Sequence, residues 1–210
     1  MTWISVTPQI LTAALLLLLP GGLLAFLGFR LRGLAAVAVS PVLSISLISV
    51  SAVAADLAGV PWSLLPVAVL TVLATLVALA LRVLLLRGRE QPVRTRGGWP
   101  VAAAEAAAVL AAALLVGRRL IFVFGSPENF SQTFDNIFHL NAVQYIADTA
   151  SASSLTIGQM TGIGFYPAGW HGLVSLVHSL AASPIPVSVN AVNLVIGALV
   201  WPLGCIFLVQ

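Results

Sequence analysis

The sequence has very few charged side chains and contains no lysine. Only 7% of its 210 residues are charged, 60% are hydrophobic, and all nine positively charged residues are arginine. A soluble domain carries roughly 25% charged residues, so this composition indicates an integral membrane protein. Nucleic-acid binding needs clustered basic side chains on a soluble surface. With a formal net charge of +3, we expect no nucleic acid among the partners.

Cysteine is almost absent as well. A single residue, Cys205, excludes an intrachain disulfide and any paired-thiol redox or zinc site. The first five residues carry no positively charged side chain, and the apolar run that follows is long enough to span a membrane. We therefore expect a retained first helix in place of a cleaved signal peptide.

Long apolar runs take up most of the chain. Crossing the hydrocarbon core of a bilayer requires about 20 apolar residues. On that basis we expect six spans, near residues 9–29, 34–56, 62–86, 99–122, 166–182 and 186–209. The predicted fold class is an all-α integral membrane protein with about six transmembrane helices and one interfacial outer helix.

The distribution of arginine predicts the orientation in the membrane. Seven of the nine follow the first and third spans: Arg30, Arg32, Arg82, Arg87, Arg89, Arg94 and Arg96. Cytoplasmic loops are enriched in positive charge, so these connections are expected inside and the long segment 123–165 outside. The short loop at Ser183-Pro184 is then expected inside. The predicted location is the plasma membrane, with an active face directed outward.

Two membrane regions follow from this organisation. Residues 1–98 form a three-span region with a basic cytoplasmic loop. This loop can attract anionic lipid head groups, but the positive-inside rule already accounts for its charge, and a role in setting the topology is favoured. Residues 99–210 form a second region that contains the outer loop. Loops longer than about 15 residues are usually functional or disordered, so chemistry is expected in this second region.

The outer loop contains a predicted helix. Residues 134–148 include no proline or glycine, and a helical period places Phe134, Phe138 and Tyr145 on one stripe. The remaining faces are also largely apolar, with two small polar patches. This pattern predicts a helix that lies between the membrane surface and the rest of the protein.

Asp135 and His139 are one helical turn apart in this segment and point the same way. Such a pair can hold a divalent cation, or it can act as a base and the group that orients it. It can equally be a helix-stabilising hydrogen bond. The spacing alone leaves these interpretations open.

Further polar and aromatic residues flank the outer loop. Tyr166 and Trp170 suit the interface between membrane and water, and His171 is expected about one turn inside the fifth span. Arg118 and Arg119 end the fourth span on the side where positive charge is disfavoured. They can extend toward lipid phosphates or bind the phosphate of a substrate, and both interpretations stay open.

The order of these features resembles the GT-C superfamily of membrane glycosyltransferases. The span at 99–122 runs outward, Asp135 follows in the outer loop, a helix lies along the membrane, and Tyr166-Pro167 leads into the next span. Several members of the superfamily carry a second proline where this chain has Ala168. The alanine-rich, lysine-free composition also resembles multipass proteins of actinobacteria, whose envelopes use polyprenyl-phosphate sugars.

The resemblance implies a function and roles for individual residues. Glycosyl transfer from a polyprenyl-phosphate sugar to a cell-envelope acceptor is expected at the outer membrane face. Asp135 would be the catalytic base, and His139 and His171 would orient it or bind a metal. The implied cofactor is a divalent cation, Mg²⁺ or Mn²⁺, held by Asp135 and His139.

The resemblance also implies the partners. Arg118 or Arg119 would neutralise the leaving polyprenyl phosphate, and Tyr166 and Trp170 would contact the substrate. The expected partners are a polyprenyl-phosphate lipid donor, membrane lipids, and another membrane subunit or a further C-terminal part that completes the site.

Two alternatives from other classes remain. In a transporter or flippase component, Asp135, His139 and Glu105 would relay protons or bind an ion. Proton pathways require polar residues throughout the membrane depth, and the predicted spans contain few. In a non-catalytic assembly subunit, the outer helix would be a docking surface.

Overall fold

A computed structural model describes residues 1–85 and 98–209 of the chain. Within these residues the secondary structure is helical and contains no strand, which confirms the all-α membrane class. The predicted basic loop with Arg87, Arg89, Arg94 and Arg96 lies outside the described residues.

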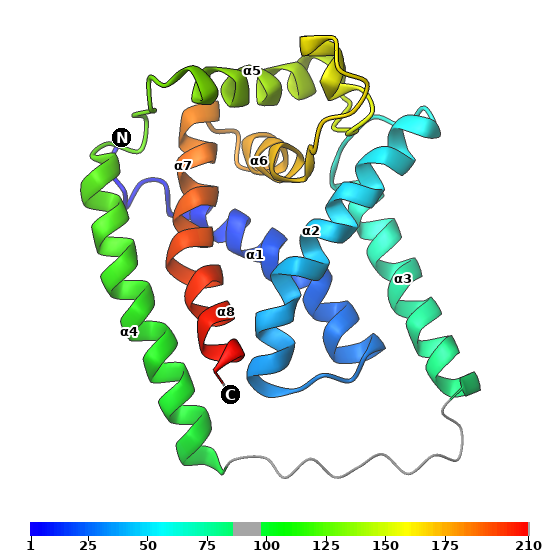
Figure 1. The fold of residues 1–210 in the computed structure, drawn as a ribbon, viewed down its shortest axis with the longest axis vertical. Coiled ribbons are helices and arrows are strands. Elements are labelled where there is room, and N and C mark those ends of the chain that lie inside the picture. The colour runs from blue at the N-terminus through cyan, green and yellow to red at the C-terminus, as the bar shows by residue number, and fades with distance from the viewer. Residues whose placement is uncertain (86–97, 210) are drawn as a thin grey trace.

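Five helical segments are long and apolar enough to cross a membrane (Figure 1). They are α1 (Thr7–Leu23) continued by η1 (Leu24–Gly28), α2 (Gly33–Leu57), α3 (Leu64–Leu85), α4 (Trp99–Phe124), and the segment Ile185–Leu208, in which α7 (Ile185–Val195) continues through η3 (Ile196–Val200) into α8 (Trp201–Leu208). Each agrees with a predicted span to within about two residues. Apolar runs long enough to cross a bilayer core therefore predicted the positions of these five helices correctly.

The predicted span at 166–182 is wrong. The structure has α6 (Gly169–Leu180) in this place, a helix of 12 residues. At 1.5 Å per residue such a helix is about 18 Å long, too short to cross a hydrocarbon core of about 30 Å. Seven consecutive residues of α6, from His171 to Val177, are buried. Its apolar character therefore reflects packing inside the protein and not exposure to lipid.

The helices arrange the two ends of the bundle differently (Figure 1). The connection from η1 to α2, the end of α3 and the start of α4 lie at one end. At the opposite end, α5 (Phe134–Thr149) lies across the bundle, with α6 beneath it and η2 (Ile157–Thr161) beside it. The connection that holds Arg30 and Arg32 is thus remote from the segment expected on the outer side.

The short α6 changes the path of the chain after it. Because α6 does not cross the bundle, Ser183-Pro184 connects α6 to α7 near α5, and α8 ends at the opposite end of the bundle (Figure 1). The expectation that this connection lies on the side of the basic loops is therefore wrong. Removal of one crossing reverses the direction of every helix after it.

One apolar core joins several of the helices. Leu17 of α1, Ile48 of α2, Val143 of α5, Leu173 of α6 and Val192 of α7 belong to one buried cluster, each at 1% exposure or less. The cross-lying α5 and α6 are therefore packed into the same core as the spans. This packing supports the position of any side chain that they carry.

The helices α1 and α2 approach each other closely at Gly21. Its backbone N–H donates to Ser44 Oγ at 2.8 Å, and a Cβ at this position would overlap the Ser40 carbonyl oxygen and approach the Ser44 nitrogen. Extra atoms in a packed interface typically cost about 1–3 kcal/mol. Gly21→Ala is therefore expected to lower the apparent melting temperature of the protein in detergent.

Gly204 provides the matched control for this substitution. It lies in α8, and a Cβ there would meet no atom within 4 Å. Gly204→Ala is expected to leave the melting temperature unchanged or raise it, because alanine favours a helix. An equal melting temperature for Gly21→Ala and wild type would contradict the close contact between α1 and α2.

Candidate functional site

The helix α5 begins where the sequence predicts it. The Thr133 side chain accepts a hydrogen bond from the Asn136 backbone nitrogen at 3.4 Å and caps the first turn. Ala142, Val143 and Ile146 are buried on the face turned toward the bundle. The first two turns of α5, which carry Asp135 and His139, therefore lie between the capped start of the helix and its buried residues.

Close packing against α2 sets the position of α6. A Cβ at Gly169 would collide with the Ser49 side chain, so glycine lets the start of α6 lie directly on α2. Just before the helix, the Ala168 backbone nitrogen donates to Ser154 Oγ at 3.1 Å. The indole of Trp62 donates to Ser175 Oγ at 3.0 Å and ties α6 to the connection between α2 and α3. His171, one turn into α6, is held by this framework.

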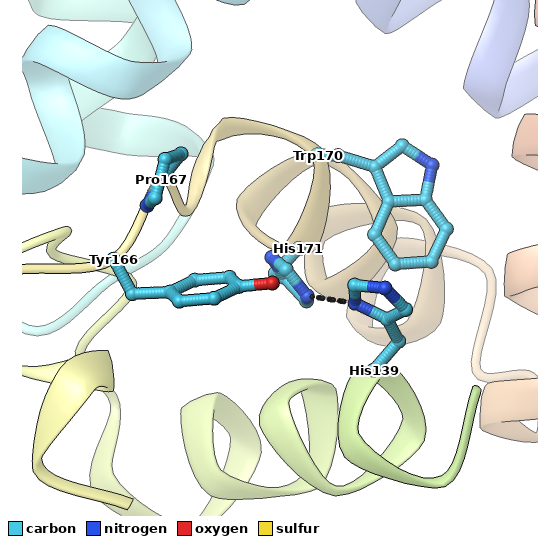
Figure 2. A pocket seen from close by; sticks show the side chains of 5 residues that line it. All are labelled: His139, Tyr166, Pro167, Trp170 and His171. Atoms are coloured by element: carbon cyan, nitrogen blue, oxygen red, sulfur yellow. Dashed lines mark hydrogen bonds between the residues drawn. The ribbon is translucent and has the colours of Figure 1, made fainter. Parts of the chain in front are cut away.

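Two histidines meet at the contact between α5 and α6 (Figure 2). His139 Nδ1 and His171 Nε2, 32 residues apart in the chain, are joined by a hydrogen bond of 2.9 Å. The other ring nitrogen of His139 lies 3.4 Å from Asp135 Oδ2. Asp135, His139 and His171 therefore form a continuous line that starts at a carboxylate with 86% of its surface exposed and ends at an imidazole with only 3% exposed.

Aromatic rings surround the pair. Tyr166, Pro167 and Trp170 line a hollow of about 590 Å³ together with His139 and His171 (Figure 2); we call it the histidine hollow. The ring centroid of Trp170 lies 5.6 Å from that of His139 and 5.1 Å from that of His171. Ligand pockets of about 300–1,000 Å³ with a few polar groups are typical binding sites.

Burial keeps His171 neutral. Desolvation of the ring, followed by the charge of His139, lowers the pKa of His171 from 6.5 to about 4, while the nearby Pro167 carbonyl acts in the opposite direction. Nδ1 of His171 is buried, and it makes no hydrogen bond with any described residue. In the hydrogen bond between His139 Nδ1 and His171 Nε2, only one of the two nitrogens carries a proton at neutral pH. The nearby Asp135 carboxylate can stabilise a proton on His139 Nε2.

The structure does not bring all predicted site residues together. Asp135, His139, Tyr166, Trp170 and His171 meet at the contact between α5 and α6.

Arg118 and Arg119 line a different hollow on α4, with Leu115 and Phe122. The Arg119 guanidinium carbon lies 5.5 Å from the centroid of the Phe122 ring. Because both arginines face this separate hollow, the geometry does not associate them with the histidine line.

The predicted cation remains a prediction. Asp135 Oδ2 and His139 Nε2 are close enough to share an ion, but His171 engages the other nitrogen of His139. Within residues 1–85 and 98–209, no group of three or more His, Cys, Asp or Glu side chains is arranged to hold a metal. We therefore assign no chemical step to Mg²⁺ or Mn²⁺.

Asn193 is a site residue that the sequence analysis missed. Its Oδ1 accepts a hydrogen bond of 3.2 Å from the Trp170 indole and orients that ring over the histidines. A signal was present, because Asn190 and Asn193 are one turn apart on the same face of a largely apolar span. Polar residues inside a span are often functional.

The fold and this site define a class: a multi-span helical membrane protein with a histidine- and aromatic-lined hollow at one end of its bundle. The chain belongs to the DUF6541 family, a family of unknown function, whose model matches residues 14–210. No curated protein and no solved structure matches the chain. The matched residues include most of the first predicted membrane region and all of the second.

Proposed function

We propose that the protein transfers a sugar from a polyprenyl-phosphate donor to a cell-envelope acceptor at the outer face of the plasma membrane. The observation that supports this proposal is the line of Asp135, His139 and His171, whose two histidines line an open hollow. It combines an exposed carboxylate with a ring that fixes its orientation, which is what general base catalysis requires. The hollow lies at one end of a bundle of membrane-spanning helices, where the head group of a lipid donor would be accessible.

The proposed step involves one proton transfer and one substitution at carbon. The Asp135 carboxylate accepts the proton of an acceptor hydroxyl, and the hydroxyl oxygen forms a bond to the anomeric carbon of the donor sugar. The bond from that carbon to the phosphate oxygen breaks, and the polyprenyl phosphate leaves with the bonding electrons. His139 acts as a positioning residue, because its Nε2 lies 3.4 Å from the carboxylate.

The buried histidine supports this arrangement from behind. His171 is neutral at pH 7, so it adds no positive charge that would weaken the carboxylate as a base. Its hydrogen bond to His139 limits rotation of that ring. Tyr166 and Trp170 offer aromatic faces, on which the C–H groups of a sugar ring can pack.

The two arginines have a separate place in the proposal. Arg118 and Arg119 lie in the last two turns of α4, where their side chains can bind the phosphate of the lipid donor at the membrane surface. The proposal limits them to the first capture of the donor, since their hollow is distinct from the histidine hollow. The donor phosphate is bonded to the anomeric carbon, so it must lie beside Asp135 when that bond breaks. They take no part in the proposed proton transfer.

The direct test is binding and turnover with a polyprenyl-phosphate sugar in lipid nanodiscs. Polyprenyl phosphate without the sugar serves as competitor, and product formation is followed by mass spectrometry with a mixture of envelope glycans as acceptors. We expect saturable donor binding and a glycosylated product. Absence of donor binding by the folded protein would overturn the proposal, and donor movement across the bilayer without a product would favour a flippase component.

A further inference from the structure

A second hollow lies next to the histidine hollow, and five of the eleven residues that line it carry side-chain amides. Its volume is about 620 Å³. The polar residues that line it include Glu128, Asn129, Gln132, Asn136, Asn190 and Asn193. We call it the amide hollow. Phe124 and Phe130 also line this hollow, so its lining includes both polar and aromatic groups.

Hydrogen bonds to the backbone hold several of these amides in place. Asn190, with 6% of its surface exposed, donates to the Pro127 and Asn129 carbonyl oxygens at 2.9 and 2.6 Å. The Asn129 amide donates to the Phe124 carbonyl at 3.0 Å, and that of Asn136 to the Ser131 carbonyl at 2.7 Å. The hollow is thus organised before any ligand binds.

Other atoms of these side-chain amides have no hydrogen-bond partner among the described residues. The side-chain oxygens of Asn129 and Asn136 accept no hydrogen bond there, and the Asn193 nitrogen donates none. Gln132 is exposed at the rim. Each amide offers both donors and acceptors, so the wall matches a ligand in which donors and acceptors alternate, as in a ring of hydroxyl groups.

The charge of the lining argues against an anionic ligand. Glu128 is the charged residue among those that line the amide hollow, and the amino group of Met1 pairs with it at 2.8 Å. This hydrogen bond and charge lower the pKa of the Glu128 carboxyl. A phosphate is normally bound by arginine or lysine, and neither lines the hollow. The lining therefore suits an uncharged ligand.

Two contacts connect the amide hollow with the histidine hollow. Asn193 lines the amide hollow and accepts the hydrogen bond of the Trp170 indole, which lines the histidine hollow. On α5, Asn136 of one hollow is one turn from His139 of the other. A ligand in the amide hollow would therefore contact the first turn of α5, which also carries Asp135.

We propose that the amide hollow binds a neutral carbohydrate, which is the acceptor in the proposed glycosyl transfer. The amides hydrogen-bond its hydroxyl groups, and the phenylalanine rings pack against its C–H faces. The identity of the hollow as an acceptor site rests on the proposed function, whereas carbohydrate binding itself can be measured independently. Specificity for a hydroxylated ligand follows because a bound ligand would cover these amides, and an amide that is covered but left unpaired is costly.

Carbohydrate binding is tested by saturation-transfer NMR on the whole protein in nanodiscs. The probes are methyl glycosides of neutral hexoses and pentoses, with glycerol and an acetylated glycine peptide as comparisons. We expect Gln132→Leu and Asn193→Leu each to raise the Kd of a bound glycoside about three- to tenfold, the effect of one lost hydrogen bond. Asn141→Leu changes an exposed amide of α5 that does not line the hollow, and is expected to have no effect.

The outcomes separate this inference from the proposed function. Glycoside binding that depends on Gln132 and Asn193 supports the carbohydrate site even if the wild type transfers no sugar, in which case the proposed function alone fails. Transfer by a wild type that shows no saturable glycoside binding overturns the carbohydrate site alone. Preferential binding of the peptide, or equal Kd values in all three variants, also overturns it. Equal melting temperatures verify that the variants are folded.

Discussion

Asp135→Asn is expected to lower the rate of sugar transfer about 100-fold or more while the affinity for the polyprenyl-phosphate donor stays unchanged. General base catalysis contributes roughly 10²- to 10⁴-fold to a rate, and an amide cannot accept the proton. Asparagine has nearly the same shape, and the Asp135 side chain is 86% exposed, so the fold should be unaffected. The measurement is single-turnover transfer in nanodiscs, with donor binding determined separately.

Asp148 is the matched control on the same helix. It is exposed near the end of α5, where it accepts a hydrogen bond from Gln144. Asp148→Asn is expected to transfer sugar at the wild-type rate. Full activity of Asp135→Asn would remove Asp135 as the base. A weaker donor affinity with an unchanged rate would instead assign this carboxylate to substrate binding.

Acidification from pH 7 to pH 4 is expected to destabilise the protein by about 3 kcal/mol through His171. Burial lowers its pKa in the folded protein to about 4, against 6.5 in the unfolded chain, and one pKa unit corresponds to about 1.4 kcal/mol. Between these pH values the unfolded chain binds a proton that the folded protein does not. The contribution of neutral His171 to the free energy of unfolding is therefore complete above pH 6.5, declines as the pH falls, and is lost below pH 4.

The pH dependence is measured as the apparent melting temperature in detergent. His171 lies in α6, outside the five membrane-spanning segments, and faces His139 of α5 and the ring of Tyr166. His171→Gln is expected to flatten the decline, because the new side chain does not titrate. His178→Gln, in the last turn of α6, is expected to retain it. A decline of equal size in the wild type and in His171→Gln would show that other groups cause it.

Part of this fold follows directly from local patterns in the sequence. Five spans were predicted correctly, since a run of about 20 apolar residues is long enough to span the bilayer wherever its neighbours lie. The helix from Phe134 was located by its helical period and by the absence of proline and glycine. The pairing of Asp135 with His139 also follows from one turn of that helix.

The error at 166–182 has a physical cause. An apolar run of 17 residues is compatible both with a short span and with a buried helix, because lipid and a protein core favour the same side chains. The burial of His171 to Val177 against α2, α5 and α7 decides in favour of the second. These contacts come from distant parts of the chain, so hydropathy contains no information about them.

The sequence by itself determined that the protein is a helical membrane protein, where five of its spans lie, and that one helical turn joins Asp135 to His139. Only the tertiary structure decided that His171 meets His139, that Arg118 and Arg119 face another hollow, and that amides from α5 and α7 line a common wall. Period and apolar length are local properties of a chain. Contacts between residues 32 or more positions apart depend on how the helices pack, which no local pattern specifies.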